Sequence, residues 1–126
     1  MSFDWEQYLT LAEELATRLD EASKRTAISR AYYFVFNVAY SRLSRNAGPC
    51  PEHAAVHKWC WDRYRDSPDP SCKQLGLVGD RMKARRVEAD YNLATKARLS
   101  DDVRRTIQEA RQFQAELNTL APRFPQ

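Results

Sequence analysis

The sequence predicts an all-α protein, an up-and-down bundle of about five helices. Apolar residues recur every three or four positions in successive segments, and the strict alternation of strands is nearly absent. Turn-forming residues separate the segments, as in DSPDP at 66–70. A chain of 126 residues favours one domain. We therefore expect a single helical domain over 1–126, with a C-terminal tail from about 121 and with antiparallel neighbours joined by short loops.

The first predicted helix covers roughly residues 3–19 and the second about 22–45. In the first, apolar side chains share one face: Tyr8, Leu11, Ala12, Leu15 and Leu19. In the second, Ser23 suits the N-cap and Gly48 suits the stop.

The second segment is apolar around most of its circumference. Its central stripe consists of Ile28, Ala31, Tyr32, Val35, Ala39 and Leu43. Only a narrow polar strip remains, flanked by Tyr33 and made of Thr26, Arg30, Asn37 and Ser41. This pattern predicts the central helix of the bundle, with a strip that faces water, a groove or another subunit.

The last three predicted helices begin near Pro51, near residue 71 and at Ser100. Proline suits a first helical turn, and we expect that helix to end near Asp66. The next covers about 71–91, although Gly76 and Gly79 disfavour its first half. The last presents the stripe Val103, Ile107, Ala110, Gln114, Leu117 and Ala121.

Composition narrows the class of protein. The N-terminus, MSFDWEQYLT, lacks the basic and apolar run of a secretion signal, and the most apolar stretch is about half of a membrane span. Three cysteines without a CxxC motif fit reduced thiols. We therefore expect a cytoplasmic protein with no membrane association and no cofactor, because motifs for phosphate loops and metalloproteases are also absent.

The net charge of +3 is unevenly distributed. Residues 1–24 hold six acids and two bases, a charge of −4, so the remainder carries +7. Region 81–98 concentrates basic side chains. This region suits contact with phosphates, and solvated helix faces give the same pattern.

The stretch CPEHAAVHKWC raises the question of a metal. Cys50, His53, His57 and Cys60 are spaced by 3, 4 and 3 residues. A straight helix separates the outer cysteines by about 15 Å, too far to share one tetrahedral ion. We therefore predict no metal site, with Cys60 in the core and His57 at its edge.

RRVEADY, at 85–91, places a charge pair on an apolar helix face. Arg86 and Asp90 lie four residues apart, within reach of each other. The pair fits a partly buried salt bridge that fixes helix packing. It equally fits an arginine at a cleft that binds phosphate, oriented by Asp90 and Tyr91.

Together, SRAYYFVFNVAYSRL at 29–43 and RRVEADY resemble paired segments of the HEPN family, the higher eukaryote and prokaryote nucleotide-binding domain. The matching positions are Ser29, Arg30, Ala31, Tyr32, Tyr33, Phe36, Ala39, Arg86, Ala89, Asp90 and Tyr91. His57 matches a histidine common near the start of the third helix. The resemblance extends over about residues 5–120.

The resemblance implies a helical bundle, usually a homodimer, in toxin–antitoxin or other phage-defence systems, often beside a small nucleotidyltransferase. Active members are metal-independent ribonucleases whose R-x4-6-H motifs from two subunits share a cleft. The implied catalytic residues are Arg86, Asp90, Tyr91 and His57. The implied groove for RNA or a nucleotide includes Arg30, Tyr33, Asn37 and Arg85.

The chain departs from this pattern because no histidine follows Arg86 at the required spacing, and Asn37 stands where many relatives have histidine. Either His57 or Tyr91 substitutes, or the domain binds without cutting. Two other functions stay open: a non-catalytic helical adaptor or dimerisation module, and a small RNA-binding subunit of a ribonucleoprotein.

Overall fold

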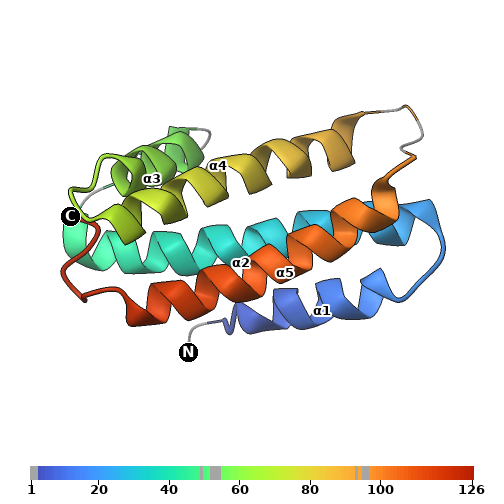
Figure 1. The fold of residues 1–126 in the computed structure, drawn as a ribbon, viewed down its shortest axis with the longest axis horizontal. Helices are drawn as coiled ribbons and strands as arrows, with labels where there is room; N and C mark the ends of the chain where they lie inside the picture. The colour runs from blue at the N-terminus through green and yellow to red at the C-terminus, as the bar shows by residue number, and fades with distance from the viewer. Residues whose placement is uncertain (1–2, 49, 52–54, 93, 95–96) are drawn as a thin grey trace.

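The computed structural model describes residues 3–48, 50–51, 55–92, 94 and 97–126. They form five helices, α1 (Glu6–Ala16), α2 (Glu21–Ala47), α3 (Ala55–Arg65), α4 (Pro70–Tyr91) and α5 (Leu99–Thr119). No strand occurs among these residues. Helices α1 and α2 run antiparallel, as do α4 and α5 (Figure 1). The predicted all-α bundle is confirmed.

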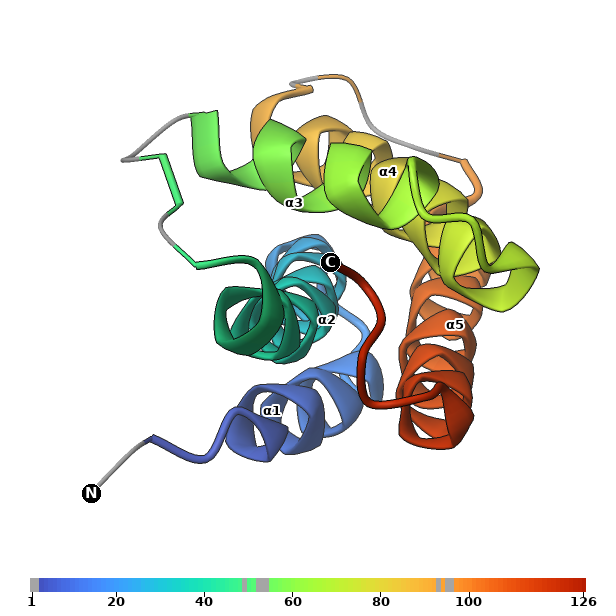
Figure 2. The ribbon, with the colours of Figure 1, turned by 90° about the vertical axis from the view of Figure 1, so that its left-hand side faces the viewer.

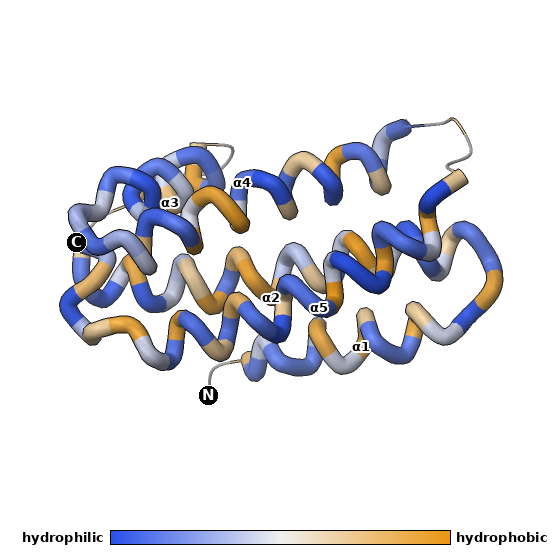
Figure 3. Tube along the Cα trace, in the orientation of Figure 1, coloured by the Kyte–Doolittle hydropathy of each residue, from blue (hydrophilic) through white to orange (hydrophobic). Residues whose placement is uncertain are grey.

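Helix α2 is the centre of the bundle, as predicted. It contacts each of the other four helices, which lie above it, below it and on one side of it in the end-on view (Figure 2). Its whole predicted stripe is buried, together with Phe34 and Phe36. One core unites all five helices, with Leu9, Phe34, Trp61, Met82 and Phe113 as a member from each. Hydrophobic and hydrophilic residues alternate along the helices (Figure 3), as amphipathic packing requires.

The boundaries of α2 refine the expected caps. Asp20, not Ser23, is the N-cap, because its carboxylate accepts a hydrogen bond from the Ser23 backbone N–H. Gly48 ends the helix as predicted, with a φ of 76° that favours glycine. Pro51 lies outside the helical bounds of α3, and residues 52–54, including His53, fall outside the described part of the chain.

The two glycines of α4 lie inside the helix because α3 packs directly on them. A Cβ added at Gly76 would lie 2.6 Å from Arg65 Cγ, and one at Gly79 would lie 2.4 Å from the Trp61 ring. Trp61 is fully buried. Glycine therefore lets the two helices approach closely, although it lowers the intrinsic helix propensity.

The C-terminal tail is tied to α2 by Arg42. Its guanidinium donates to the carbonyl oxygens of four residues: Leu117, Leu120, Ala121 and Phe124. This clamp gives acceptors to the guanidinium and a donor to the Leu120 and Phe124 carbonyls, which follow the end of α5.

Within the described ranges, no helix is both long and apolar enough to cross a membrane.

Candidate functional site

Arg86 of α4 lies at the centre of a cluster formed with α2 and α3. Its side chain is only 12% exposed. The guanidinium carbon lies 5.7 Å from the centre of the Tyr32 ring and 5.3 Å from that of Tyr33. Both distances allow cation–π attraction. The sequence placed Arg86 on the apolar side of its helix, and the structure buries it there.

The protein satisfies this guanidinium incompletely. Arg86 Nη1 lies 3.3 Å from Asp90 Oδ2, longer than a strong charge-assisted hydrogen bond. The Nε atom is buried and has no acceptor. Arg63 and Arg65 also have an unpaired Nε. Arg63 lies over the Trp59 ring, and Arg65 is 41% exposed and contacts two carboxylates, Asp62 and Asp80. Arg86 combines a largely covered side chain with one long ionic contact.

Asp90 links Arg86 to the polar strip of α2. Ser29 Oγ donates to Asp90 Oδ2 at 3.3 Å, and Arg30 Nη2 donates to Ser29 Oγ at 3.4 Å. The Arg30 guanidinium lies between two rings, with its carbon 5.1 Å from the centre of Tyr8 and 4.9 Å from that of Tyr33. Arg30 and Arg86 therefore both rest on aromatic faces, and Asp90 contacts Arg86 directly and Arg30 through Ser29.

His57 enters the same cluster from α3. Its Nδ1 lies 2.6 Å from Tyr32 Oη, and its ring stacks on Phe36 with centroids 3.8 Å apart. Burial, followed by the positive charges of Lys83 and Arg86, lowers the pKa of His57 to about 4. The imidazole is therefore neutral at physiological pH.

A chain of hydrogen bonds favours one tautomer of His57. The indole Nε1–H of Trp61 can only donate, and it donates to Tyr32 Oη at 3.1 Å. The Tyr32 proton is then directed to His57 Nδ1, because this is the other partner of that hydroxyl. This arrangement favours the His57 tautomer that carries its proton on Nε2.

The cluster brings together most of the predicted site residues. Arg86, Asp90, His57, Arg30 and Tyr33 are joined by direct contacts. Sequence reasoning missed Tyr8, Ser29, Lys83 and Trp61 as participants and treated Tyr32 as core only. The resemblance contained the signal for Ser29 and Tyr32, whereas Tyr8 comes from a helix outside both motifs.

Three predicted residues lie elsewhere. Tyr91 is 71% exposed at the end of α4. Asn37 Nδ2 donates to the Tyr33 carbonyl of its own helix at 2.7 Å. Arg85 points to α5, where its Nη1 lies 2.6 Å from Glu109 Oε1. Asn37 therefore meets the cluster only at the Tyr33 backbone, Arg85 pairs with α5, and Tyr91 is exposed.

The basic region 81–98 is partly neutralised. Arg81 and Arg85 both pair with Glu109, and Arg86 approaches Asp90. Lys96 lies outside the described residues. A continuous cationic surface for an RNA backbone is therefore less developed here than the sequence suggested.

The described members of the Cys/His motif, Cys50, His57 and Cys60, have separate surroundings. Cys50 Sγ lies 2.6 Å from Tyr40 Oη, His57 contacts Tyr32, and Cys60 is buried. Across the part of the chain that the structure describes, no group of three or more potential ligands is arranged around a common point.

The geometry supports binding of an anion. Phosphate oxygens would accept hydrogen bonds from three kinds of donor here: the largely covered guanidinium, a nearby lysine and a neutral imidazole N–H. A scan of protein-family models, a search of curated proteins and a search of solved structures each find no match to this chain. The evidence for a function therefore comes from this cluster and from the two sequence motifs.

Proposed function

We propose that this chain is a HEPN-type protein of a prokaryotic toxin–antitoxin or phage-defence module. Its Arg86 cluster would bind a phosphate group of RNA or of a nucleotide. The chain would act as a homodimer, beside a nucleotidyltransferase-type partner protein.

The observation that supports this proposal most is the state of Arg86. Burying a guanidinium is costly unless its donors are satisfied, and Asp90 satisfies it only at 3.3 Å. A bound phosphate would supply the missing acceptor oxygens. Lys83 adds a second positive charge near His57, as its effect on the histidine pKa indicates. The cluster therefore has a surplus of cations over its one carboxylate, Asp90.

His57 extends the proposal from binding to cleavage. It contacts Tyr32 and Tyr33, the tyrosines that Arg86 also contacts. In metal-independent cleavage, the RNA 2′-hydroxyl attacks phosphorus, and the departing 5′-oxygen must gain a proton. A bound phosphate would raise the pKa of His57, and the ring in its protonated form would donate the Nε2 proton to the 5′-oxygen. Water would take the proton of the 2′-hydroxyl, and Arg86 would hold the phosphate. The histidine would thus come from α3 of the same chain instead of following Arg86 in sequence.

The test compares wild type with Arg86→Gln, His57→Gln and Arg81→Gln on defined single-stranded RNA, with and without EDTA. Arg81 is the matched control, because it lies on the same helix but is 53% exposed and pairs with Glu109. We expect cleavage that survives EDTA and Arg81→Gln and is lost in the other two variants. If RNA binds without being cleaved, and only Arg86→Gln weakens the binding, the phosphate site is supported and the ribonuclease activity is refuted. RNA and nucleotide affinities unchanged by Arg86→Gln would refute the proposal.

A non-catalytic adaptor is the second candidate, supported by the Arg30–Ser29–Asp90–Arg86 chain that ties α2 to α4. In that case the cluster serves packing alone. Arg86→Ala would then lower the melting temperature markedly without changing any binding. A near-neutral melt with lost binding would favour the phosphate site.

A further inference from the structure

A row of alternating rings and cations leads from the Arg86 cluster to the start of α1. Arg86 and Arg30 both lie on the Tyr33 ring, with guanidinium carbons 5.3 Å and 4.9 Å from its centre. The Arg30 carbon also lies 5.1 Å from the centre of the Tyr8 ring, and that centre lies 5.4 Å from the centre of the Phe3 ring. We call these residues the aromatic track.

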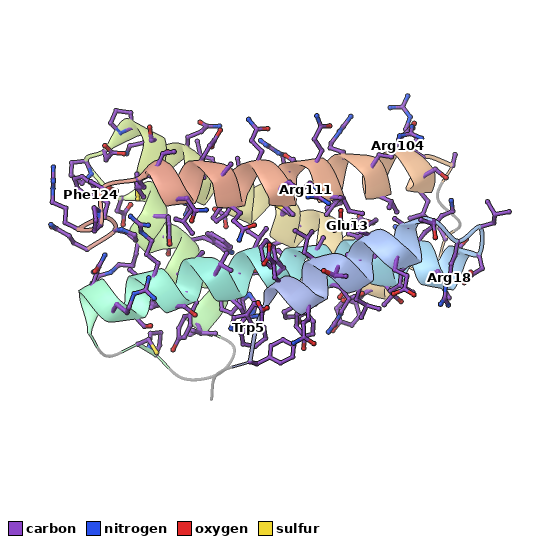
Figure 4. The ribbon with its side chains drawn as sticks, turned by 90° about the horizontal axis from the view of Figure 1, so that it is seen from below. Trp5, Glu13, Arg18, Arg104, Arg111 and Phe124 are labelled. Carbon is purple, nitrogen blue, oxygen red and sulfur yellow. The ribbon has the colours of Figure 1, made fainter. Side chains whose placement is uncertain are left out.

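The aromatic track crosses a flank of α2 that α5 leaves open. Helices α1 and α4 lie on opposite sides of α2, and α5 lies along one of the flanks between them (Figure 2). Tyr33 points about 180° around α2 from Arg42, which binds the end of α5, so Tyr33 belongs to the other flank. Tyr8 likewise points about 140° around α1 from Glu13, which pairs with Arg111 of α5 (Figure 4). Solvent therefore reaches the track from this open flank.

Arg30 is a cation with spare hydrogen-bond donors. Among the residues that the structure describes, its hydrogen bonding consists of the 3.4 Å contact to the neutral Ser29 hydroxyl, and no carboxylate pairs with it. Arg86 has its one long contact to Asp90. Because each guanidinium carbon lies about 5 Å from the centre of the Tyr33 ring, the two carbons are at most about 10 Å apart. This pair of cations suits two neighbouring phosphates of one strand.

The far end of the track is aromatic and carries no cation. The Phe3 ring is 48% exposed and lies 4.9 Å from the Trp5 ring, at the start of α1 (Figure 4). The Trp5 ring in turn lies 5.5 Å from Tyr8. Two exposed acids, Asp4 and Glu6, lie beside these rings in the sequence and disfavour a phosphate there. An uncharged base that stacks on an exposed ring suits this end better.

We infer that the aromatic track binds single-stranded RNA, with one phosphate on Arg86, the next on Arg30 and an unpaired base on Phe3 and Tyr8. The inference rests on the phosphate site proposed above, and it assigns that site to an internal stretch of strand instead of a mononucleotide. A duplex suits the track less well, because its stacked and paired bases leave no free face for the rings.

The test measures the affinity of the full chain for a 2′-O-methyl tetraadenylate. All phosphates of this ligand are internal, and it lacks the 2′-hydroxyl that cleavage requires. A second strand of the same length and charge carries no bases, and inorganic phosphate reports on the Arg86 site alone. We expect the tetraadenylate to bind at least about fivefold more tightly than the abasic strand, the effect of one stacked base.

Two variants separate the base from the phosphate. Phe3→Ala should weaken the tetraadenylate about fivefold or more and leave the abasic strand unchanged. Arg30→Gln should weaken both strands and reduce the slope of log affinity against log salt by about 0.7, the value for one phosphate contact. The matched controls are Leu77→Ala, at a side chain 45% exposed on α4, and Arg63→Gln, whose guanidinium lies 5.7 Å from the centre of the Trp59 ring. Both controls should keep the wild-type affinities.

Three results would overturn the track. Equal affinities for the tetraadenylate and the abasic strand would exclude a base on the rings. Affinities unchanged in both Phe3→Ala and Arg30→Gln would exclude these side chains as contacts. ADP that binds as tightly as the tetraadenylate would assign the two cations to a pyrophosphate. In each case, inorganic phosphate that binds the wild type but not Arg86→Gln would still support the phosphate site. If neither phosphate nor either strand binds, the track and the phosphate site are both refuted.

Discussion

Protonation of His57 should destabilise the folded chain at mildly acidic pH. The pKa of His57 is about 4 in the folded protein, against 6.5 for an unperturbed histidine, chiefly because burial disfavours the charged ring. The unfolded chain therefore takes up a proton at a pH where the folded chain does not. Stability is complete above about pH 6.5 and falls as the pH drops toward 4.

The size of this loss follows from the two pKa values. Their difference corresponds to at most about 3 kcal/mol, and partial exposure of the ring reduces the expected loss to about 1–2 kcal/mol. Urea unfolding of wild type and His57→Gln at pH 7.5 and 4.5 isolates this contribution. Glutamine cannot titrate, and its side-chain oxygen can still accept from Tyr32. The wild type should lose about 1–2 kcal/mol more than the variant over this range.

His53→Gln is the matched control, because His53 is the other of the two histidines. It should keep the wild-type dependence on pH. The reasoning is wrong if His57→Gln loses as much stability as wild type, or if an NMR titration places the His57 pKa at 6.5 or higher.

Three further predictions concern packing and ion pairs. Gly79→Ala should lower the free energy of unfolding by about 1–3 kcal/mol in urea denaturation, since the new methyl group would collide with the buried Trp61 ring. Arg42→Met should cost about 2–4 kcal/mol and expose residues 120–126 to limited proteolysis, because the Leu120 and Phe124 carbonyl oxygens lose the donor that Arg42 supplies. Arg85→Met should lower the melting temperature, because Glu109 loses its shorter ion pair, while RNA affinity stays at the wild-type value.

For each of these three variants, one result would contradict the prediction. A neutral Gly79→Ala would mean that α3 can move away from α4. A tail that stays protected in Arg42→Met would show that apolar contacts of the tail suffice. Lost RNA binding in Arg85→Met, with the fold intact, would move the binding surface from the Arg86 cluster toward α5.

Periodicity predicted the fold well because α2 is apolar around most of its circumference, and such a helix must lie at the centre of a bundle. It could not show that Gly76 and Gly79 belong inside a helix, since their reason is the close approach of α3, a tertiary contact. The buried face of α5 also differs in part from the predicted apolar stripe. Phe113 and Thr106 are buried there, whereas Gln114 and Ile107 are only partly covered.

The candidate site was predicted through motifs and not through geometry. The two motifs placed Arg86, Asp90 and the polar strip of α2 near one another, and the structure joins them. The spacing could not separate Arg85 from Arg86, whose side chains take opposite directions, to Glu109 and to Tyr33. Neither could it reveal the Trp61–Tyr32–His57 chain, because these residues meet only when α3 packs on α2.

The central claim is that Arg86 and His57 bind one phosphate together. Its most direct test is NMR observation of the Arg86 side-chain N–H and the His57 ring while inorganic phosphate, a mononucleotide and a short RNA are added in turn. The claim predicts that both signals shift together and saturably, and that the pKa of His57 rises from about 4 as negative charge arrives beside it. Shifts confined to exposed arginines, with the Arg86 and His57 signals unchanged, would contradict it.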